Sequence, residues 1–257
     1  MYLLGRTQMI PTNTYEDAIK RIMAKGFDGV EIGIYSRDFS VREEFFAEDF
    51  AARMKDVFAG FRVKACSVGA HMDYTESEVK FNAVKNAIAV AKELGSQIVI
   101  INGALRNGNE PIKQQWNRQV QATKRLCDYA EEHGVFLAME FEPGFVVDNT
   151  ETMLNLFSEI SSPMLRVNAD IGHIFLQDPD PMASIEKCGK LIVHAHLENM
   201  KHGIHNHLVP FEGDMNLPEY ITKLRSVGFD GPASFDAYQY DYESVAEETV
   251  RYFRSIL

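Results

Sequence analysis

The stretch GFDGVEI (Gly26–Ile32) has a near-copy close to the other end of the chain, GFDGPASFD (Gly228–Asp236). Each copy follows a helical pattern and begins with a glycine, which can take the left-handed conformation that ends a helix. Each copy then leads into a short apolar run of the kind that forms a buried strand. Two such units, far apart in a chain of 257 residues, predict that one helix-to-strand module recurs along it.

The intervening sequence repeats this alternation. After a weaker opening run, YLLGR (2–6), the strand-like runs are DGVEIGI (28–34), RVKACSV (62–68), QIVIIN (97–102), VFLAMEF (135–141), LRVNAD (165–170), LIVHAHL (191–197) and PASFDAY (232–238). Their continuous apolar character is typical of strands that helices cover on both faces. Between them lie stretches with a helical spacing of apolar residues, such as SEVKFNAVKNAIAVAKELG (77–95).

Eight strands that alternate with helices in about 250 residues predict an α/β fold, a single (β/α)₈ TIM barrel that spans residues 1–257 as one domain. A doubly wound open sheet is the competing architecture. That fold usually carries a glycine-rich phosphate loop after its first strand, and GRTQMIP (5–11) does not have that pattern. The barrel is therefore the favoured prediction.

The composition indicates a globular protein whose partners are neither nucleic acids nor membranes. With a formal net charge of −11, the chain lacks the basic face on which nucleic acids or anionic lipids bind. Cys66, Cys127 and Cys188 are scattered and odd in number, so neither a disulfide framework nor a thiolate zinc site is indicated. The first residues lack a signal-peptide layout, and no apolar run reaches transmembrane length. We therefore expect a cytoplasmic protein that acts on a small molecule, and the sequence leaves open whether it forms a homo-oligomer.

Groups that can bind a metal lie at or just beyond the carboxyl ends of the last four predicted strands, the end of such a barrel where the chemistry takes place. These groups are Glu140 and Glu142, Asp170 and His173, His194 and His196, and finally Asp236. Residues two apart in a strand share a face, so periodicity alone does not choose between Glu140 and Glu142, or between His194 and His196. Three carboxylates and one imidazole suit Mn²⁺, Mg²⁺ or Co²⁺, with Zn²⁺ less favoured. A cation would also stabilise the charge of Asp170 in its apolar surroundings.

The ordered motifs resemble the xylose-isomerase-like TIM-barrel superfamily of sugar isomerases and epimerases. The resemblance rests on GFDGVEI, GVFLAMEFEPG (134–144), NADIGHIF (168–175), VHAHLEN (193–199), VPFEGDMN (209–216) and GFDGPASFD, and it covers nearly the whole chain. It implies one divalent metal ion, with Glu140, Asp170, His196 and Asp236 as its ligands. It also implies that His173 and His71 meet the substrate.

The implied ligands define a class of reaction in carbohydrate metabolism. A carbon acid next to a carbonyl is hard to deprotonate in water, and a metal on the carbonyl and hydroxyl oxygens stabilises the enediolate that forms. Flanking carboxylates can then remove a proton and return it. The resemblance gives these roles to Glu140 and Asp236, with Glu140 the stronger candidate. We therefore expect a metal-dependent isomerase or epimerase of a sugar or polyol-derived carbonyl compound.

Three positions depart from the pattern of the family. Asp236 replaces the family's last glutamate and is one methylene shorter, which removes about 1.5 Å of reach. The free-ketose epimerases of the family carry a further glutamate where this chain has Val146, and an arginine where it has His202. These differences argue against direct assignment as a ketohexose 3-epimerase and indicate a different substrate end of the pocket.

Two further candidates for substrate contact are Glu31, which closes the second strand, and His207 in the loop ENMKHGIHNHLVPFEGD (198–214). A metal-dependent dehydratase or another lyase on the same scaffold begins with the same proton abstraction, so the sequence does not separate it from an isomerase. A binding protein that has lost catalysis is the other alternative, because Asp236 is short. The substrate, its phosphorylation state and the native metal, including manganese, stay open.

Overall fold

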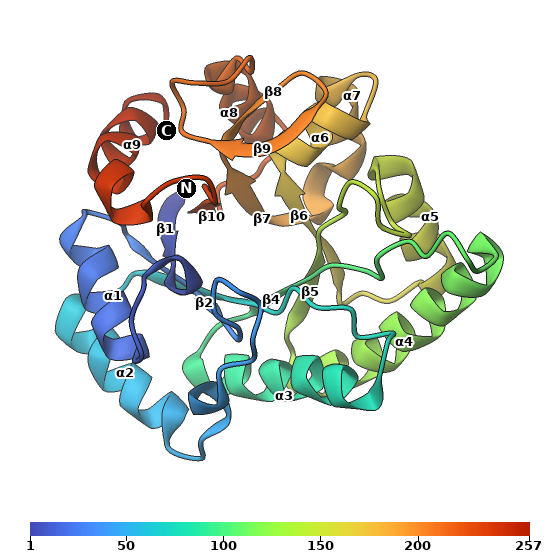
Figure 1. Ribbon diagram of the computed structural model, residues 1–257, viewed down its shortest axis with the longest axis horizontal. Helices are drawn as coiled ribbons and strands as arrows, with labels where there is room; N and C mark the ends of the chain where they lie inside the picture. The colour runs from blue at the N-terminus through green and yellow to red at the C-terminus, as the bar shows by residue number, and fades with distance from the viewer.

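The computed structural model describes residues 1–257 and shows eight parallel strands closed into a barrel, in the order β1-β10-β7-β6-β5-β4-β3-β2 (Figure 1). The strands are β1 (Tyr2–Arg6), β2 (Gly29–Gly33), β3 (Ala65–Gly69), β4 (Ile98–Ile101), β5 (Phe136–Met139), β6 (Leu165–Asp170), β7 (Ile192–Leu197) and β10 (Pro232–Phe235). The predicted (β/α)₈ barrel is confirmed. The two copies of the GFDG motif lead into β2 and β10, the two neighbours of β1 in the ring.

The helices form an outer ring around the strands (Figure 1). They are α1 (Tyr15–Ala24), α2 (Phe50–Phe61), α3 (Glu78–Leu94), α4 (Ile112–His133), α5 (Thr150–Ile160), α6 (Ile171–Gln177), α7 (Pro181–Cys188), α8 (Leu217–Ser226) and α9 (Tyr242–Ile256), with short 3-10 turns η1 (Thr7–Met9), η2 (Glu43–Phe46) and η3 (Gly189–Leu191). α3 matches its predicted range because Ser77 caps its first turn and Gly95 ends it in the left-handed conformation. None of these helices combines the length and the apolar character needed to cross a bilayer.

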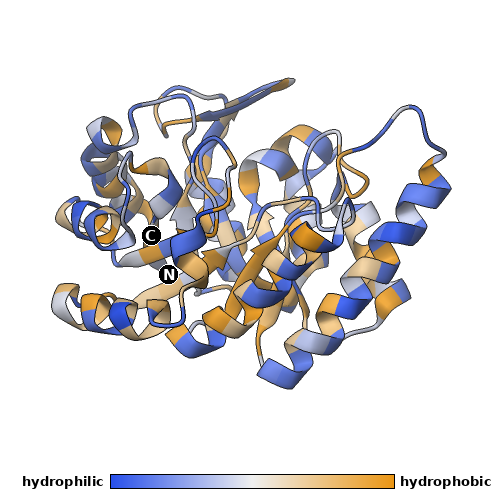
Figure 2. Cartoon of the chain, turned by 60° about the horizontal axis from the view of Figure 1, so that its bottom comes forward, coloured by the Kyte–Doolittle hydropathy of each residue, from blue (hydrophilic) through white to orange (hydrophobic).

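The main core lies between the strands and the helices and contains 63 buried apolar residues. In Figure 2 the central strands are mostly hydrophobic, and the helices change between hydrophobic and hydrophilic along their length, as amphipathic helices do. The barrel interior is different, because buried polar side chains occupy it toward the carboxyl ends of the strands. Ser67, Ser234 and Asn168 all lie within hydrogen-bond distance of His194 there.

The histidine-rich segment after β7 forms a hairpin, where the sequence had indicated only a loop. Its strands are β8 (Asn199–Lys201) and β9 (Ile204–Leu208), paired antiparallel. Asn199 anchors the base of the hairpin, because its side chain donates to the carbonyl of Pro210 and accepts the N–H of Met215. The hairpin thereby carries His205 and His207 toward the barrel axis.

Candidate active site and metal centre

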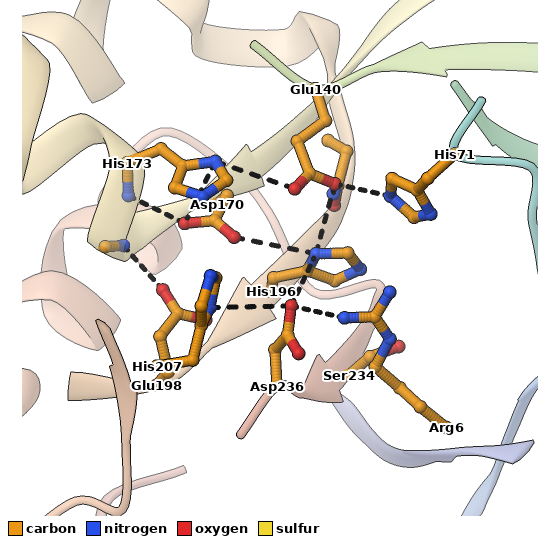
Figure 3. A network of polar contacts seen from close by, with 12 residues as sticks. Arg6, His71, Glu140, Asp170, His173, His196, Glu198, His207, Ser234 and Asp236 are labelled. Carbon is orange, nitrogen blue, oxygen red and sulfur yellow. Dashed lines mark hydrogen bonds and ion pairs between the residues drawn. The ribbon is translucent and has the colours of Figure 1, made fainter. Parts of the chain in front are cut away.

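The four ligands that the sequence implies lie together at the carboxyl ends of β5, β6, β7 and β10, and we call them the ligand cluster. Nδ1 of His196 lies 3.1 Å from Oε2 of Glu140, 3.6 Å from Oδ2 of Asp170 and 3.7 Å from Oδ2 of Asp236. Figure 3 shows the four side chains pointing toward one another from different strands. All four are buried. Residues as far apart as Glu140 and Asp236 thus meet in one cluster.

The geometry of the ligand cluster fits a divalent cation. Ligand atoms about 2.0–2.2 Å from a metal lie roughly 3–3.6 Å from one another, and the three separations from Nδ1 of His196 are close to this range. The four residues belong to two adjacent groups of donors, each with its atoms within 4.8 Å of one another: His71, Glu140 and His196, and Asp170, Glu198, His207 and Asp236. Nδ1 of His196 and Oδ2 of Asp170, two of the atoms that face each other in the cluster, are buried without a hydrogen-bond partner. Each unsatisfied buried polar atom costs about 1–3 kcal/mol, and a cation would remove that cost.

Local structure explains how Asp170 comes to face the cluster. Asp170 is the N-cap of α6, and its Oδ1 accepts the backbone N–H of His173 at 2.7 Å. This cap fixes the carboxylate, so that Oδ2 is left to face His196. The Asp-x-x-His spacing in the sequence is therefore the spacing of a helix cap.

Two neighbouring side chains hold Glu140 in place. Oε2 of Glu140 lies 2.9 Å from Nε2 of His71, and it accepts a hydrogen bond of 2.6 Å from the Asn168 amide. Nδ1 of His71 in turn lies 2.6 Å from the hydroxyl of Tyr35. Glu140 is thus oriented from β6 and from the segment after β3.

His196 is held from its other ring nitrogen. Nε2 of His196 lies 3.0 Å from Oε2 of Glu31, and Oε1 of Glu31 accepts a hydrogen bond of 3.0 Å from Nε of Arg6. Arg6 also forms an ion pair with Asp236. The carboxylate–histidine contact orients the imidazole so that Nδ1 points into the ligand cluster.

Three further histidines, His173, His205 and His207, lie close together beside the cluster. Nδ1 of His173 is 2.9 Å from the carbonyl oxygen of Phe141, and its Nε2 is 2.9 Å from Nε2 of His205. Nε2 of His207 lies 3.1 Å from the same nitrogen of His205, and its Nδ1 lies 3.7 Å from Oδ2 of Asp236. The hairpin therefore adds two imidazoles to the rim of the site.

The electrostatics of the cluster favour a positive charge at its centre. Burial by itself raises the pKa of Glu140, but His196 and His71 lower it, and the pKa lies well below the usual range. Burial likewise opposes ionisation of Asp170, yet nearby His173 lowers the pKa of that carboxyl. Burial lowers the pKa of His196, while Glu140 and Glu31 raise it well above its usual value. The shifts of these three groups agree in favouring a positive charge beside His196.

Two further carboxyl groups near the cluster behave differently. Burial raises the pKa of Glu142 to about 7, against the opposing effect of His173. Burial, together with the charge of Asp170, raises the pKa of Glu198 well above its usual range. Burial therefore disfavours the charge on Glu142 and Glu198, whereas neighbouring histidines favour it on Glu140 and Asp170.

A cavity of about 300 Å³ opens onto the cluster. Its lining residues are Arg6, Tyr35, Phe39, His71, Asn102, Glu140, Glu142, Phe145, His205, His207, Asp236 and Tyr238. Of the predicted site residues, Glu140, Asp236, His71 and His207 therefore face the cavity. Asp170, His196, His173 and Glu31 lie outside its lining.

The structure also resolves the choices that periodicity left open. Glu140 lies in the ligand cluster, whereas Glu142 is 3.8 Å from His173 through its Oε2. His194 lies within hydrogen-bond distance of Asn168 and Ser67, and burial lowers its pKa to about 3, so it is neutral.

Sequence reasoning missed two supporting residues, Arg6 and Asn168. Arg6 is the last residue of β1, so the strand-end test would have found it if applied to the first strand. Its register partner Glu31 lies in the middle of β2 and not, as the sequence had indicated, at the end of that strand. Asn168 lies two residues before Asp170 on β6, and its amide nitrogen is 2.6 Å from Glu140. The sequence signal for Asn168 was its place two positions before a predicted ligand, since residues two apart in a strand share a face.

The fold is that of a known family. Residues 19–256 match the model of the xylose isomerase-like TIM barrel family, and the chain belongs to that family. The expected superfamily is therefore confirmed.

Particular relatives include both epimerases and dehydratases. Fructoselysine 3-epimerase of Shigella flexneri is 24% identical over 278 residues, covering 100% of this chain and 97% of that protein. The 3-dehydroshikimate dehydratase of Bacillus anthracis is 22% identical over 236 residues, covering 82% of each. The crystal structure of a D-tagatose 3-epimerase-like protein superposes with a TM-score of 0.84 at 18% identity, over 100% of this chain and 98% of that one.

Proposed function

We propose that the protein is a divalent-metal-dependent isomerase or epimerase of a sugar or polyol-derived carbonyl compound. One observation carries the proposal, namely the convergence of three carboxylate oxygens on Nδ1 of His196 beside a cavity of about 300 Å³. The epimerases among the relatives support it. Mainly oxygen donors favour Mn²⁺, Mg²⁺ or Co²⁺ over Zn²⁺.

A divalent cation bound by the cluster would supply Lewis-acid stabilisation of negative charge on substrate oxygens. Glu140 is the base that removes a proton from the carbon next to the carbonyl, because it faces the cavity and is held by His71 and Asn168. Asp236 faces the same cavity from β10 and is the candidate to return the proton. Two carboxylates at one cavity provide the pair that this reaction class requires.

The other cavity residues suit a polyhydroxylated molecule. His207 has one ring nitrogen, Nδ1, without a hydrogen-bond partner, which can meet a substrate hydroxyl. Both ring nitrogens of His71 are taken up by Glu140 and Tyr35, so we assign His71 to orienting Glu140. Tyr35, Phe39 and Tyr238 form an aromatic wall along which Phe39 stacks on both tyrosines. Aromatic faces pack well against the C–H surfaces of sugars, since both surfaces are apolar. Glu31 lies behind His196, so we assign it a supporting role instead of substrate contact.

A dehydratase is the second candidate, favoured by the relative of that activity. It would use the same Glu140 to abstract the proton and then expel a hydroxyl group. The two reactions differ in their products, because dehydration releases one water and isomerisation keeps every atom.

The test is incorporation of deuterium from D₂O into candidate sugars and polyol-derived ketones, followed by NMR and mass spectrometry, with Mn²⁺-loaded protein. We expect exchange at a carbon next to the carbonyl and an isomeric product of unchanged composition. E140Q should lose this exchange by about 10²–10⁴-fold. E142Q is the matched control, because Glu142 is a nearby carboxylate that lines the same cavity. This variant should still bind Mn²⁺. Full exchange by E140Q, or equal exchange by metal-free protein, would overturn the proposal.

A further inference from the structure

We propose that Arg6 is a positioning residue for the cation site, and that it braces two metal ligands at once. It does so through a continuous set of contacts, Asp236–Arg6–Glu31–His196, which we call the support chain. The proposal rests on the proposed metal site. It goes beyond that site because it assigns a role to a residue that holds no cation itself.

The strand register places the members of the support chain side by side. β10, β1 and β2 are consecutive neighbours in the barrel, with Leu4 paired to Ser234 and Arg6 paired to Glu31. Arg6 lies two residues after Leu4, and Asp236 lies two residues after Ser234. Arg6 and Asp236 are therefore at the same height along the barrel axis. Three adjacent strands thus present a negative, a positive and a negative side chain in a row.

Arg6 is bonded on both sides of this row. Its Nε donates to Oε1 of Glu31 at 3.0 Å, its Nη1 pairs with Asp236, and its Nη2 lies 3.4 Å from the Tyr35 hydroxyl. The residue is only 2% exposed, and Figure 3 shows its guanidinium directed at Asp236. A planar guanidinium can hold two carboxylates at fixed angles, which a lysine ammonium cannot do.

Glu31 extends the chain of contacts to the second ligand. Its Oε2 lies 3.0 Å from Nε2 of His196, and the Glu31 side chain is fully buried. His196 is thereby held with Nδ1 toward the ligand cluster. Arg6 therefore orients Asp236 directly and His196 through Glu31, so the positions of both ligands depend on one guanidinium.

The short side chain of Asp236 makes this bracing necessary. Its Oδ2 lies 3.7 Å from Nδ1 of His196, the longest of the three separations in the cluster, and its Oδ1 has no hydrogen-bond partner. The ion pair with Arg6 is therefore the strong contact that orients this carboxylate. Without it, a buried aspartate would lose both its orientation and its compensating charge.

Cobalt binding tests the proposal, because the visible absorption of Co²⁺ reports on its ligands independently of turnover. We expect R6M to bind Co²⁺ about 10–100-fold more weakly than wild type, with an altered visible band. R6K should recover part of the affinity, since it restores the charge but not the two-sided geometry. R42M is the matched control: Arg42 pairs with Glu44 and stacks on Tyr15 outside the cavity lining, so this variant should lose stability and keep the cobalt spectrum.

The outcomes separate this proposal from the proposed function. If wild type binds no Co²⁺, Mn²⁺ or Mg²⁺, the metal site itself fails, and the role of Arg6 fails with it. If wild type binds Co²⁺ and R6M keeps its affinity and spectrum, only the role of Arg6 is overturned. If R6M does not fold, R6K decides: reduced affinity with a changed spectrum supports the proposal, and wild-type values for both overturn it.

Discussion

The two halves of the barrel differ in what they contribute to the candidate site. β5, β6, β7 and β10 supply the ligand cluster, whereas β1, β2 and the segment after β3 supply Arg6, Glu31 and His71. Each of these three side chains contacts at least one member of the cluster. One half of the barrel thus supplies the donors, and the other half supplies three side chains that orient them, in addition to Asn168 and the cap of α6 within the ligand half.

The candidate metal site therefore depends on side chains from both halves of the ring. The ligand half is rich in carboxylates, and its ionised groups repel one another unless a cation or a proton lies between them. The support half contributes Arg6, which is buried and shared by two carboxylates. Variants in the two halves should therefore fail in different ways.

The largest effect is expected in the ligand half, from D170N. This change removes a charged oxygen from the cluster while it keeps an N-cap side chain on α6. We expect Mn²⁺ affinity to fall by at least about 10³-fold, since a ligand charge is lost. Isothermal titration calorimetry measures it.

D178N is the matched control at the other end of α6. Asp178 is the C-cap of that helix and accepts hydrogen bonds from the backbone and side chain of Thr150. D178N should lower stability and leave Mn²⁺ affinity unchanged. Equal loss of binding in both variants would mean that α6 has been disrupted and that Asp170 has no special role.

An intermediate effect is expected in the support half, from E31Q. The amide can still accept one hydrogen bond, but it loses the charge that faces both Arg6 and His196. We expect Mn²⁺ affinity to fall by about 10–100-fold, in the range typical of residues that orient a metal ligand. Complete loss of binding would place Glu31 among the ligands, and unchanged affinity would end the distinction between the two halves.

A smaller effect is expected from Y35F, one contact further from the cluster. The Tyr35 hydroxyl lies 2.6 Å from Nδ1 of His71, whose Nε2 lies 2.9 Å from Glu140. Losing one hydrogen bond of this kind costs about 0.5–1.5 kcal/mol, or up to about tenfold. We expect turnover to fall by that factor while Mn²⁺ affinity stays within twofold. A large loss of Mn²⁺ affinity would show that His71 supports the metal site as well as the base.

The fold could be predicted from the sequence because its signals are local and repeated. Each module carries its own helix stop and its own buried strand, as at Gly95 after α3, so no long-range contact has to be guessed. The hairpin β8–β9 escaped prediction because its residues are mostly polar and are ordered by tertiary contacts, chiefly those of Asn199.

The ligand half could be predicted in the same way, because a carboxylate or imidazole after an apolar strand is conspicuous. The side chains that contact each ligand could not be predicted, since they depend on how neighbouring strands are aligned around the barrel. Arg6 stands in a short apolar run, and only the pairing of β1 with β2 and β10 shows that it meets two carboxylates. The choice of Glu140 over Glu142 likewise needed the position of His196.

The smallest effect at the site is expected from D28N, which tests whether the support half matters through stability alone. Asp28 precedes β2, accepts the N–H of Leu3, and pairs with Lys64 and Arg254. Burial by itself raises the pKa of Asp28, but the bonds from Lys64 and Leu3 and the charge of Arg254 bring it below its ordinary value of 3.8. Since the pKa is lowered in the folded state, the stabilisation is fully present above about pH 4 and is lost as the pH falls through the folded-state pKa.

D28N should therefore lower the free energy of unfolding by about 1 kcal/mol, the upper range for partly exposed ion pairs. The penalty should be the same at every pH between 5 and 8 in urea unfolding, because Asp28 is ionised in both states there. Mn²⁺ affinity should equal that of wild type. If D28N weakened Mn²⁺ binding as much as E31Q does, general loosening of β1 and β2 would explain both variants, and the orienting role of the support half would have to be given up.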